Sequence, residues 1–122
     1  MHGSERTNFA NRNDIPRGET IARLNDQLRS ACHGGHIMVT RGVSALDGFA
    51  ASELMKALKG YDGFDIDNDP HGERDFGDLT LWGEDLLWKI DYYDTTMKFG
   101  SPDPADERVT TRVMTVMLAS EY

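Results

Sequence analysis

The 122-residue sequence lacks two features: the cysteine pairs that stabilise many small exported proteins, and the long apolar segments of membrane proteins. Its single cysteine, Cys32, cannot form a disulfide within the chain, which favours a reducing compartment. No apolar run approaches the roughly 20 residues that a membrane-spanning helix requires, and no signal-peptide pattern is present. We therefore expect a soluble, cytoplasmic protein with no membrane partner.

Basic side chains are also scarce, with 13 Lys and Arg residues against 21 Asp and Glu residues and a net charge of −8. The imbalance is concentrated in residues 62–94, the acidic stretch, which holds eleven acidic and two basic residues. Proteins bind nucleic acids through cationic side chains that displace counterions from the phosphates. Direct nucleic-acid binding is therefore not expected, and the acidic stretch is interpreted as a solvated surface, a cation site or a docking surface for a basic protein.

A chain of this length can bury one hydrophobic core but not two. Residues 1–18 are polar and show no sustained periodicity, so a mobile N-terminal tail is predicted there. Residues 19–122 carry helical and strand patterns without an internal repeat or a linker. We therefore predict a single α+β domain for residues 19–122 and leave its oligomeric state open.

The spacing of apolar residues predicts the elements of this domain. Helices are expected at residues 19–33 and 50–59, and strands at 36–40, 77–82, 86–93 and 97–99, with residues 83–85 as a hairpin turn. The apolar content of residues 36–40 predicts a central strand. A last, buried helix is predicted to begin near Asp106, because four residues lie at helical spacing after it: Val109, Val113, Val116 and Met117. The fold class is thus α+β, a small antiparallel sheet of about four strands with two to three helices packed on one face.

Residues 65–77, the acidic loop, concentrate carboxylates, one imidazole and turn-forming residues between two apolar segments. Pro70 disfavours a helical conformation at Asp69, and the Asn-Asp-Pro and His-Gly sequences interrupt regular structure, so an exposed loop is predicted. Its candidate metal ligands, or catalytic acid and base, are Asp67, Asp69, His71, Glu73 and Asp75. Carboxylate oxygens suit a hard cation and an imidazole can transfer protons near neutral pH, which would fit a small metal-dependent hydrolase.

Other features of the sequence weigh against a metal-dependent enzyme. The loop departs from the calcium-binding helix-loop-helix pattern, because His71 replaces an oxygen ligand and Asp78 replaces the bidentate glutamate. The Cys-His-Gly-Gly-His run at residues 32–36 lacks the further ligands of a zinc site. No nucleophile motif or phosphate-binding glycine loop is present, so no cofactor is expected and catalysis is not favoured. In a purely structural alternative, Asp69 and Asp75 bind backbone amides of the loop.

If the acidic stretch binds a protein, its carboxylates would steer the encounter and its aromatic residues would supply affinity. The partner's surface would then be basic. The candidate partner-binding residues are Asp65, Asp67, Glu73, Asp75, Trp82, Glu84, Asp85, Asp91, Tyr92 and Tyr93.

Four runs of the sequence carry a resemblance to a known family: residues 38–43 (MVTRGV), 67–77 (DNDPHGERDFG), 88–94 (WKIDYYD) and 99–104 (FGSPDP). They resemble a family of small bacterial proteins of unknown function, and the similarity covers residues 19–122. The position of Arg74 is often His in that family. The resemblance implies a protein carried on plasmids, integrated elements and phages, near antirestriction genes, with no established catalytic residue.

This implied context favours an inhibitor over an enzyme. The chain resembles, in size and charge, inhibitors that mimic DNA and occupy the basic DNA-binding grooves of host nucleases, as anti-CRISPR and antirestriction proteins do. We therefore expect it to bind a basic surface of a host nuclease complex. A small metal-dependent hydrolase and a non-catalytic accessory protein are the alternatives.

Overall fold

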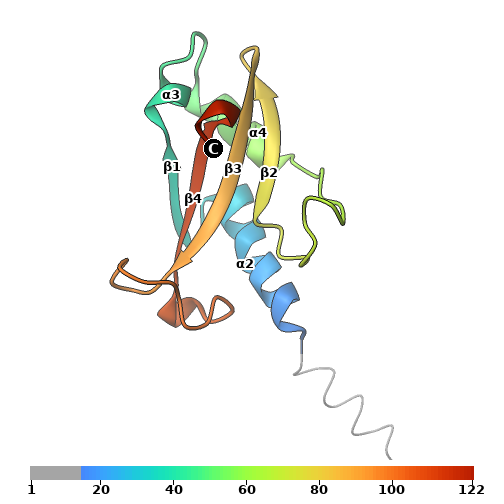
Figure 1. Ribbon diagram of the computed structural model, residues 1–122, viewed down its shortest axis with the longest axis vertical. Helices are drawn as coiled ribbons and strands as arrows, with labels where there is room; N and C mark the ends of the chain where they lie inside the picture. Colours follow the sequence, from blue (N-terminus) through green and yellow to red (C-terminus); the bar gives the residue numbers. More distant parts are fainter. Residues whose placement is uncertain (1–14) are drawn as a thin grey trace, which may run out of the picture.

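The computed structural model describes residues 15–122, so most of the predicted N-terminal tail lies outside the described residues. The described chain forms a four-stranded sheet in the order β1-β4-β3-β2 (Figure 1). The strands are β1 (Gly35–Val39), β2 (Phe76–Leu81), β3 (Glu84–Tyr93) and β4 (Thr111–Leu118). Strand β1 runs parallel to β4, whereas the β4-β3 and β3-β2 pairs are antiparallel. The α+β fold class is confirmed, but the sheet is mixed rather than purely antiparallel.

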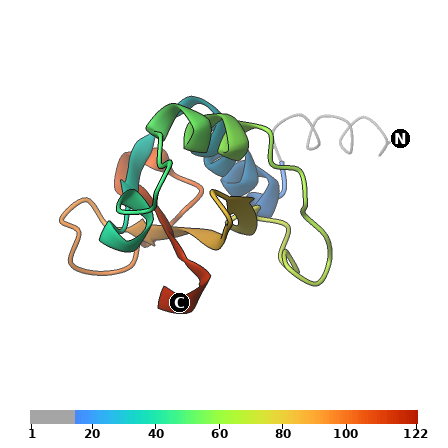
Figure 2. The same cartoon turned by 90° about the horizontal axis from the view of Figure 1, so that it is seen from above.

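Two helices, α2 (Arg17–Ala31) and α4 (Ala51–Lys59), cover one face of the sheet, and the short 3₁₀ turn η2 (Ala119–Glu121) lies on the other (Figure 2). Helix α2 ends where Cys32 adopts a left-handed conformation (φ 54°) and donates its amide to Leu28 O at 3.0 Å. A single helical turn, α3 (Arg41–Ser44), follows β1, and the side chain of Thr40 caps it by accepting a hydrogen bond from Val43 N. No helix of the described residues is long and apolar enough to cross a membrane.

The core lies between the two helices and the sheet. Strand β3 alternates as a half-buried strand should, with Leu86, Trp88 and Ile90 buried against the helices. Their packing partners include Leu28 of α2, Leu54 and Leu58 of α4, and Met114 and Val116 of β4. Tyr61 and Phe64 meet the Trp88 ring edge to face, with centroids 5.4 and 5.9 Å away. The core therefore fixes the chain directly before the acidic loop.

The predicted last helix is wrong, because residues Thr111–Leu118 form β4, in the interior of the sheet. Asp106 does cap a turn by accepting a hydrogen bond from Arg108 N, but that turn is the 3₁₀ element η1 (Glu107–Val109). Val113 and Met117 are buried, as expected for the helix. A strand buried on both faces is apolar at most positions, so its pattern resembles a wide helical stripe. The β-branched Thr and Val residues of β4 are the signal for a strand.

Two further strand predictions are corrected. Strand β1, predicted to be central, lies at the edge of the sheet. Residues 97–99 form no strand but part of the β3-β4 connection, which meets the sheet in an isolated bridge between Tyr93 and Gly100. There the Asp94 carboxylate accepts hydrogen bonds from the amides of Thr96 (3.1 Å) and Lys98 (3.2 Å). These local hydrogen bonds close a tight turn and use amides that would otherwise be available to pair with a neighbouring strand.

The β2-β3 hairpin is shorter than predicted. Only Trp82 and Gly83 separate the strands, and both have positive φ (55° and 76°), as in a type I′ turn. Trp82 Nε1 donates to Glu53 Oε1 at 3.0 Å, and the indole meets the Phe49 ring with centroids 5.3 Å apart. These contacts hold a tryptophan in a conformation that favours glycine or asparagine.

Candidate functional site

The acidic loop divides into an outer half, residues 65–71, and an inner half, residues 73–77. The outer half is organised by its own side chains. Asp65 Oδ1 accepts hydrogen bonds from the amides of Asp67 (2.9 Å) and Asn68 (3.0 Å). The Asn68 side chain in turn bonds to Asp65 N and Gly63 O, at 3.0 and 2.8 Å. Such side-chain-to-backbone bonds form a tight Asx turn, so the outer half takes its shape from local bonds.

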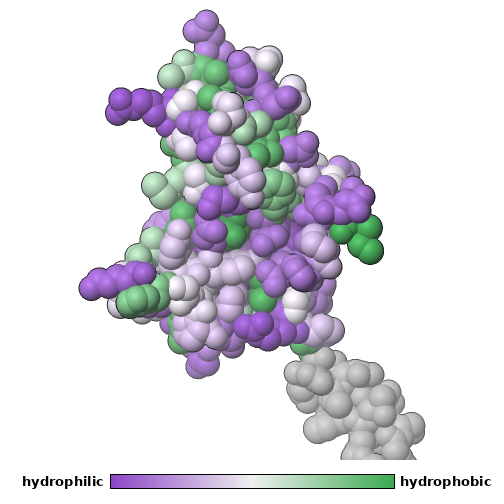
Figure 3. Space-filling view, in the orientation of Figure 1, coloured by the Kyte–Doolittle hydropathy of each residue, from purple (hydrophilic) through white to green (hydrophobic). Residues whose placement is uncertain are grey.

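This turn presents exposed side chains. Ile66 is 81% exposed, Asp67 and His71 are exposed as well, and so is Asp62, three residues before the outer half. Within the described residues, the carboxylates of Asp62 and Asp67 have no ion-pair or hydrogen-bond partner. Figure 3 shows a largely hydrophilic surface over this loop, with a protruding hydrophobic group. The outer half can therefore contact another molecule through both charge and apolar surface.

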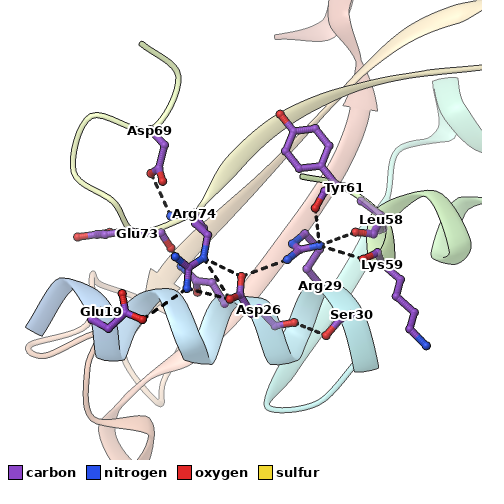
Figure 4. Close-up of polar contacts among 11 residues, drawn as sticks. Glu19, Asp26, Arg29, Ser30, Leu58, Lys59, Tyr61, Asp69, Glu73 and Arg74 are labelled. Carbon is purple, nitrogen blue, oxygen red and sulfur yellow. Dashed lines mark hydrogen bonds and ion pairs between the residues drawn. The ribbon is translucent and has the colours of Figure 1, made fainter. Parts of the chain in front are cut away.

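The inner half turns toward helix α2 (Figure 4). Gly72 (φ 69°) and Arg74 (φ 54°) redirect the chain, and the amide of Arg74 donates to Asp69 Oδ1 at 3.0 Å. The Arg74 guanidinium pairs with Asp26 of α2, Nη2 to Oδ2 2.9 Å, and lies 3.9 Å from Glu19. The hydrogen bond with Asp26 raises the pKa of Arg74. Arg74 thus ties the acidic loop to α2.

A polar cluster of Asn25, Glu73, Tyr92 and Arg112 lies beneath the inner half. Asn25 and Arg112 are almost completely buried, at 0% and 1% exposed. Asn25 Nδ2 donates to Glu73 O (3.0 Å) and to the Tyr92 hydroxyl (2.9 Å), while its Oδ1 accepts from Arg112 Nε at 2.9 Å. The Tyr92 hydroxyl donates to Glu73 Oε1 at 2.9 Å, and the Tyr92 ring lies 5.2 Å from the Arg112 guanidinium carbon. The cluster joins α2, the inner half, β3 and β4.

Burial and charge shift the ionisation of this region. Burial, together with the neighbouring charge of Glu73, raises the pKa of the half-buried Asp75 carboxyl. Burial, together with the charges of Asp75 and Glu73, raises the pKa of Tyr92, so its hydroxyl stays a donor. Burial also lowers the pKa of Arg112. Shifted carboxyl groups occur at catalytic sites. Here the Tyr92 hydroxyl bonds to Glu73 and Arg112 Nε bonds to Asn25, so the cluster links the inner half to the sheet and to α2.

A second anchor holds the segment that precedes the loop. Arg29 of α2 is buried, and its Nη1 donates to Leu58 O at 2.7 Å and to Tyr61 O at 3.3 Å. Arg29 thereby satisfies carbonyls at the C-terminal end of α4 (Figure 4). Its Nη2 lies 3.1 Å from Asp26 Oδ1, so Asp26 is shared by Arg29 and Arg74. Helix α2 therefore holds the chain on both sides of the outer half.

The candidate metal ligands are distributed over both halves of the loop. Asp67 and His71 are exposed on the outer half, Asp69 accepts the Arg74 amide, and Glu73 accepts from Tyr92. Within the described residues, no group of three or more His, Cys, Asp or Glu side chains is placed to hold a metal ion. The bond of Asp69 to a backbone amide is the one that the structural alternative expects for it.

The candidate partner-binding residues fall into four groups. These are Asp65 and Asp67 on the outer half; Glu73, Asp75 and Tyr92 at the polar cluster; Trp82, Glu84 and Asp85 at the β2-β3 hairpin; and Asp91 and Tyr93 on the sheet face opposite the helices. Asp91 is paired with Lys89, and Asp85 accepts from Thr80 at 3.2 Å. Of the candidate partner-binding residues, Asp67 and Glu84 have exposed carboxylates with no ion-pair or hydrogen-bond partner within the described residues.

The residues that position the loop were not identified from the sequence; they are Asn25, Asp26, Arg29 and Arg112. One signal for Asn25 exists, because Ile21, Asn25 and Leu28 lie at helical spacing and therefore share the buried face of α2. Arg112 carries no comparable signal, since its inward direction depends on β4 being a strand paired with β3.

No curated protein and no solved structure matches the chain. A family model described as "Protein of unknown function (DUF3768)" matches residues 39–121. This range includes α4, the acidic loop and strands β2 to β4, and it excludes α2, which supplies Asn25, Asp26 and Arg29. Because the match spans well over half of the sequence, the chain belongs to the DUF3768 family of proteins of unknown function.

Proposed function

We propose that the protein is a non-catalytic binding protein whose outer half docks on a basic surface of another protein. The observation that carries this proposal is the turn at residues 65–68, which is closed by its own side chains and displays Ile66 and the unpaired Asp67 carboxylate. A loop whose shape is already held by its own hydrogen bonds loses less conformational entropy on binding than a flexible one. Carboxylates would orient the encounter, and Ile66 would be buried in the contact.

The proposed partner is a nuclease of a host defence system, of CRISPR or restriction type, which the chain would inhibit in the cytoplasm by occupying its basic DNA-binding groove. The charge of the acidic stretch supports this partner, because eleven acids against two bases give it the sign of a nucleic-acid backbone. The resemblance to proteins carried on mobile DNA supports it as well. Such a groove would pair Asp62, Asp67 and Glu84, whose exposed carboxylates have no ion-pair or hydrogen-bond partner within the described residues.

The test compares three forms of the chain by affinity capture from a host lysate, followed by a DNA-cleavage assay with the recovered nuclease. The loop variant combines Asp62→Asn, Ile66→Ser and Asp67→Asn, which change exposed side chains. The matched control combines Asp47→Asn and Glu107→Gln, which remove the same number of exposed charges outside the acidic stretch.

We expect the wild type and the control to recover a nuclease and to slow its DNA cleavage, and the loop variant to lose both effects. Recovery should decline as salt is raised, because exposed charges act mainly on the encounter rate. Equal recovery by the loop variant and the wild type would contradict the proposal. Retention of a duplex oligonucleotide by the wild-type chain would contradict it too.

A further inference from the structure

The two edges of the sheet differ in how they are protected. Strand β2, at one edge, exposes Asp78 and Thr80, and an edge charge of this kind discourages further pairing. Strand β1, at the other edge, contains no Asp, Glu, Lys, Arg or Pro and pairs with β4 over five consecutive residues. Met38 of β1 is 58% exposed on the face opposite the helices. An unprotected apolar edge is a template for another strand.

Alternate residues of β1 direct their backbone N–H and C=O groups away from β4, toward the open side of the sheet. Thr40 N donates to Val116 O at 3.0 Å, so the backbone groups of Thr40 face β4. Because backbone groups alternate in direction along a strand, those of Met38 also face β4, whereas those of Ile37 and Val39 face away. On that side of β1 the described residues place no other strand.

We propose that β1 pairs antiparallel with β1 of a second copy of this chain, across a twofold axis at Met38. In this register Ile37 of each copy lies opposite Val39 of the other, and both are residues whose backbone groups face outward. Each such pair exchanges two N–H···O bonds, which gives four bonds between the copies. The two Met38 side chains become directly opposed neighbours, which shields both from water. An interface of this kind uses the same surface on both copies, as closed twofold dimers do.

The charge distribution favours a second copy as the occupant of this edge. Residues 33–41, which contain β1, include no acidic residue, while the acidic loop precedes β2, at the opposite edge of the sheet (Figure 1). Two copies can therefore meet at β1 with their acidic stretches pointing apart. The loop at residues 94–100 projects beyond β1 on the same side in Figures 1 and 2, and it exposes Met97 (47%) and Phe99 (71%). A second copy would extend the contact over this apolar loop.

The first test is the molar mass in solution, measured by light scattering on a sizing column and by sedimentation velocity. The wild type should have twice the chain mass of 13.7 kDa. Met38→Lys, which places two like charges at the axis, should halve the mass to that of one chain without changing the circular dichroism spectrum. Thr80→Lys, an exposed change on the β2 edge, is the matched control and should keep the double mass. A wild type that stays monomeric at high concentration, or a Met38→Lys variant that stays dimeric, would overturn the proposal.

The second test addresses the register in a Cys32→Ser background, which removes the only native thiol. Met38→Cys should form a disulfide between copies on mild oxidation, because a directly opposed, non-hydrogen-bonded pair has its Cα atoms about 4.5 Å apart, within the disulfide range. His36→Cys should not, because His36 lies opposite residue 40 of the other copy. Equal cross-linking of both variants would overturn the register. A monomer whose β1 amide signals shift only when an extended peptide is added would overturn the second copy as occupant.

Discussion

The two halves of the acidic loop both carry carboxylates but differ in their surroundings. The outer half bonds to itself through Asp65 and Asn68 and leaves Ile66 and Asp67 exposed. The inner half sends Glu73 and Arg74 to partners on α2 and β3. One loop therefore combines an anchor with a display surface.

This difference shows that a run of charges is not a single structural unit. In the inner half, polar groups are removed from water, so each of them needs a partner within the chain. In the outer half, the exposed Asp67 carboxylate keeps its hydration and is free to pair with another molecule. Substitutions in the two halves should therefore separate stability from binding.

The largest effect is expected for Asn25→Ala. The change removes the acceptor of buried Arg112 Nε and the donor to Glu73 O and the Tyr92 hydroxyl. Because buried groups, one of them charged, lose their partner, the free energy of unfolding should fall by roughly 2–4 kcal/mol. Urea unfolding followed by tryptophan fluorescence measures it. A loss as small as that of an exposed substitution would show that the polar cluster does not anchor the loop.

Tyr92→Phe should have an intermediate effect. It keeps the ring beside Arg112 and removes only the hydroxyl that bonds to Asn25 and Glu73. The Asn25 amide and the Glu73 carboxylate would each lose a hydrogen bond, which should lower the free energy of unfolding by roughly 1–2 kcal/mol. Faster amide exchange in the inner half, with unchanged exchange in the outer half, is the accompanying signature. Uniform loosening of both halves would contradict the division proposed here.

Asp75→Asn should be stabilising in a pH-dependent way. The pKa of Asp75 is raised in the folded state, so the folded state favours the protonated carboxyl. Protonation of Asp75 therefore contributes its full stabilisation below 3.8, the ordinary pKa of an aspartate, and this stabilisation is lost as the pH rises through the raised folded pKa. Asn resembles the protonated form at every pH. The variant should therefore melt at a higher temperature than the wild type at neutral pH, and the difference should shrink as the pH falls through the raised folded pKa of Asp75 and be lost below 3.8. A difference that is constant across this range would argue against the carboxyl's ionisation as the cause.

The smallest effect on stability is expected for the combined Ile66→Ser and Asp67→Asn substitutions. Both side chains are exposed, so the free energy of unfolding should stay within about 0.5 kcal/mol of the wild type. Thermal melting measures this, and Asp65→Ala, which removes the acceptor of two loop amides, serves as the contrast. A large destabilisation by the combined variant would mean that the outer half also supports the fold.

The elements that were predictable from the sequence are those with a local signal. The apolar spacing of α2 and α4, the alternation of β3 and the turn residues of the acidic loop each lie within a few neighbouring positions. The β4 prediction failed because Val113, Val116 and Met117 fit a helical stripe as well as a doubly buried strand. For the site, exposure of the outer half was predictable from Pro70 and Gly72, but the inward direction of Glu73 was not.

By itself the sequence determined that residues 65–77 form a loop, that two amphipathic helices precede it, and that charge gathers in the middle of the chain, because turn chemistry and periodicity are encoded locally. Tertiary structure alone decided that β1 is an edge strand and that half of the loop is an anchor. The bond between Asn25 and Arg112 joins residues 87 positions apart. Contacts of that range arise only when packing brings distant segments together, so no local pattern specifies them.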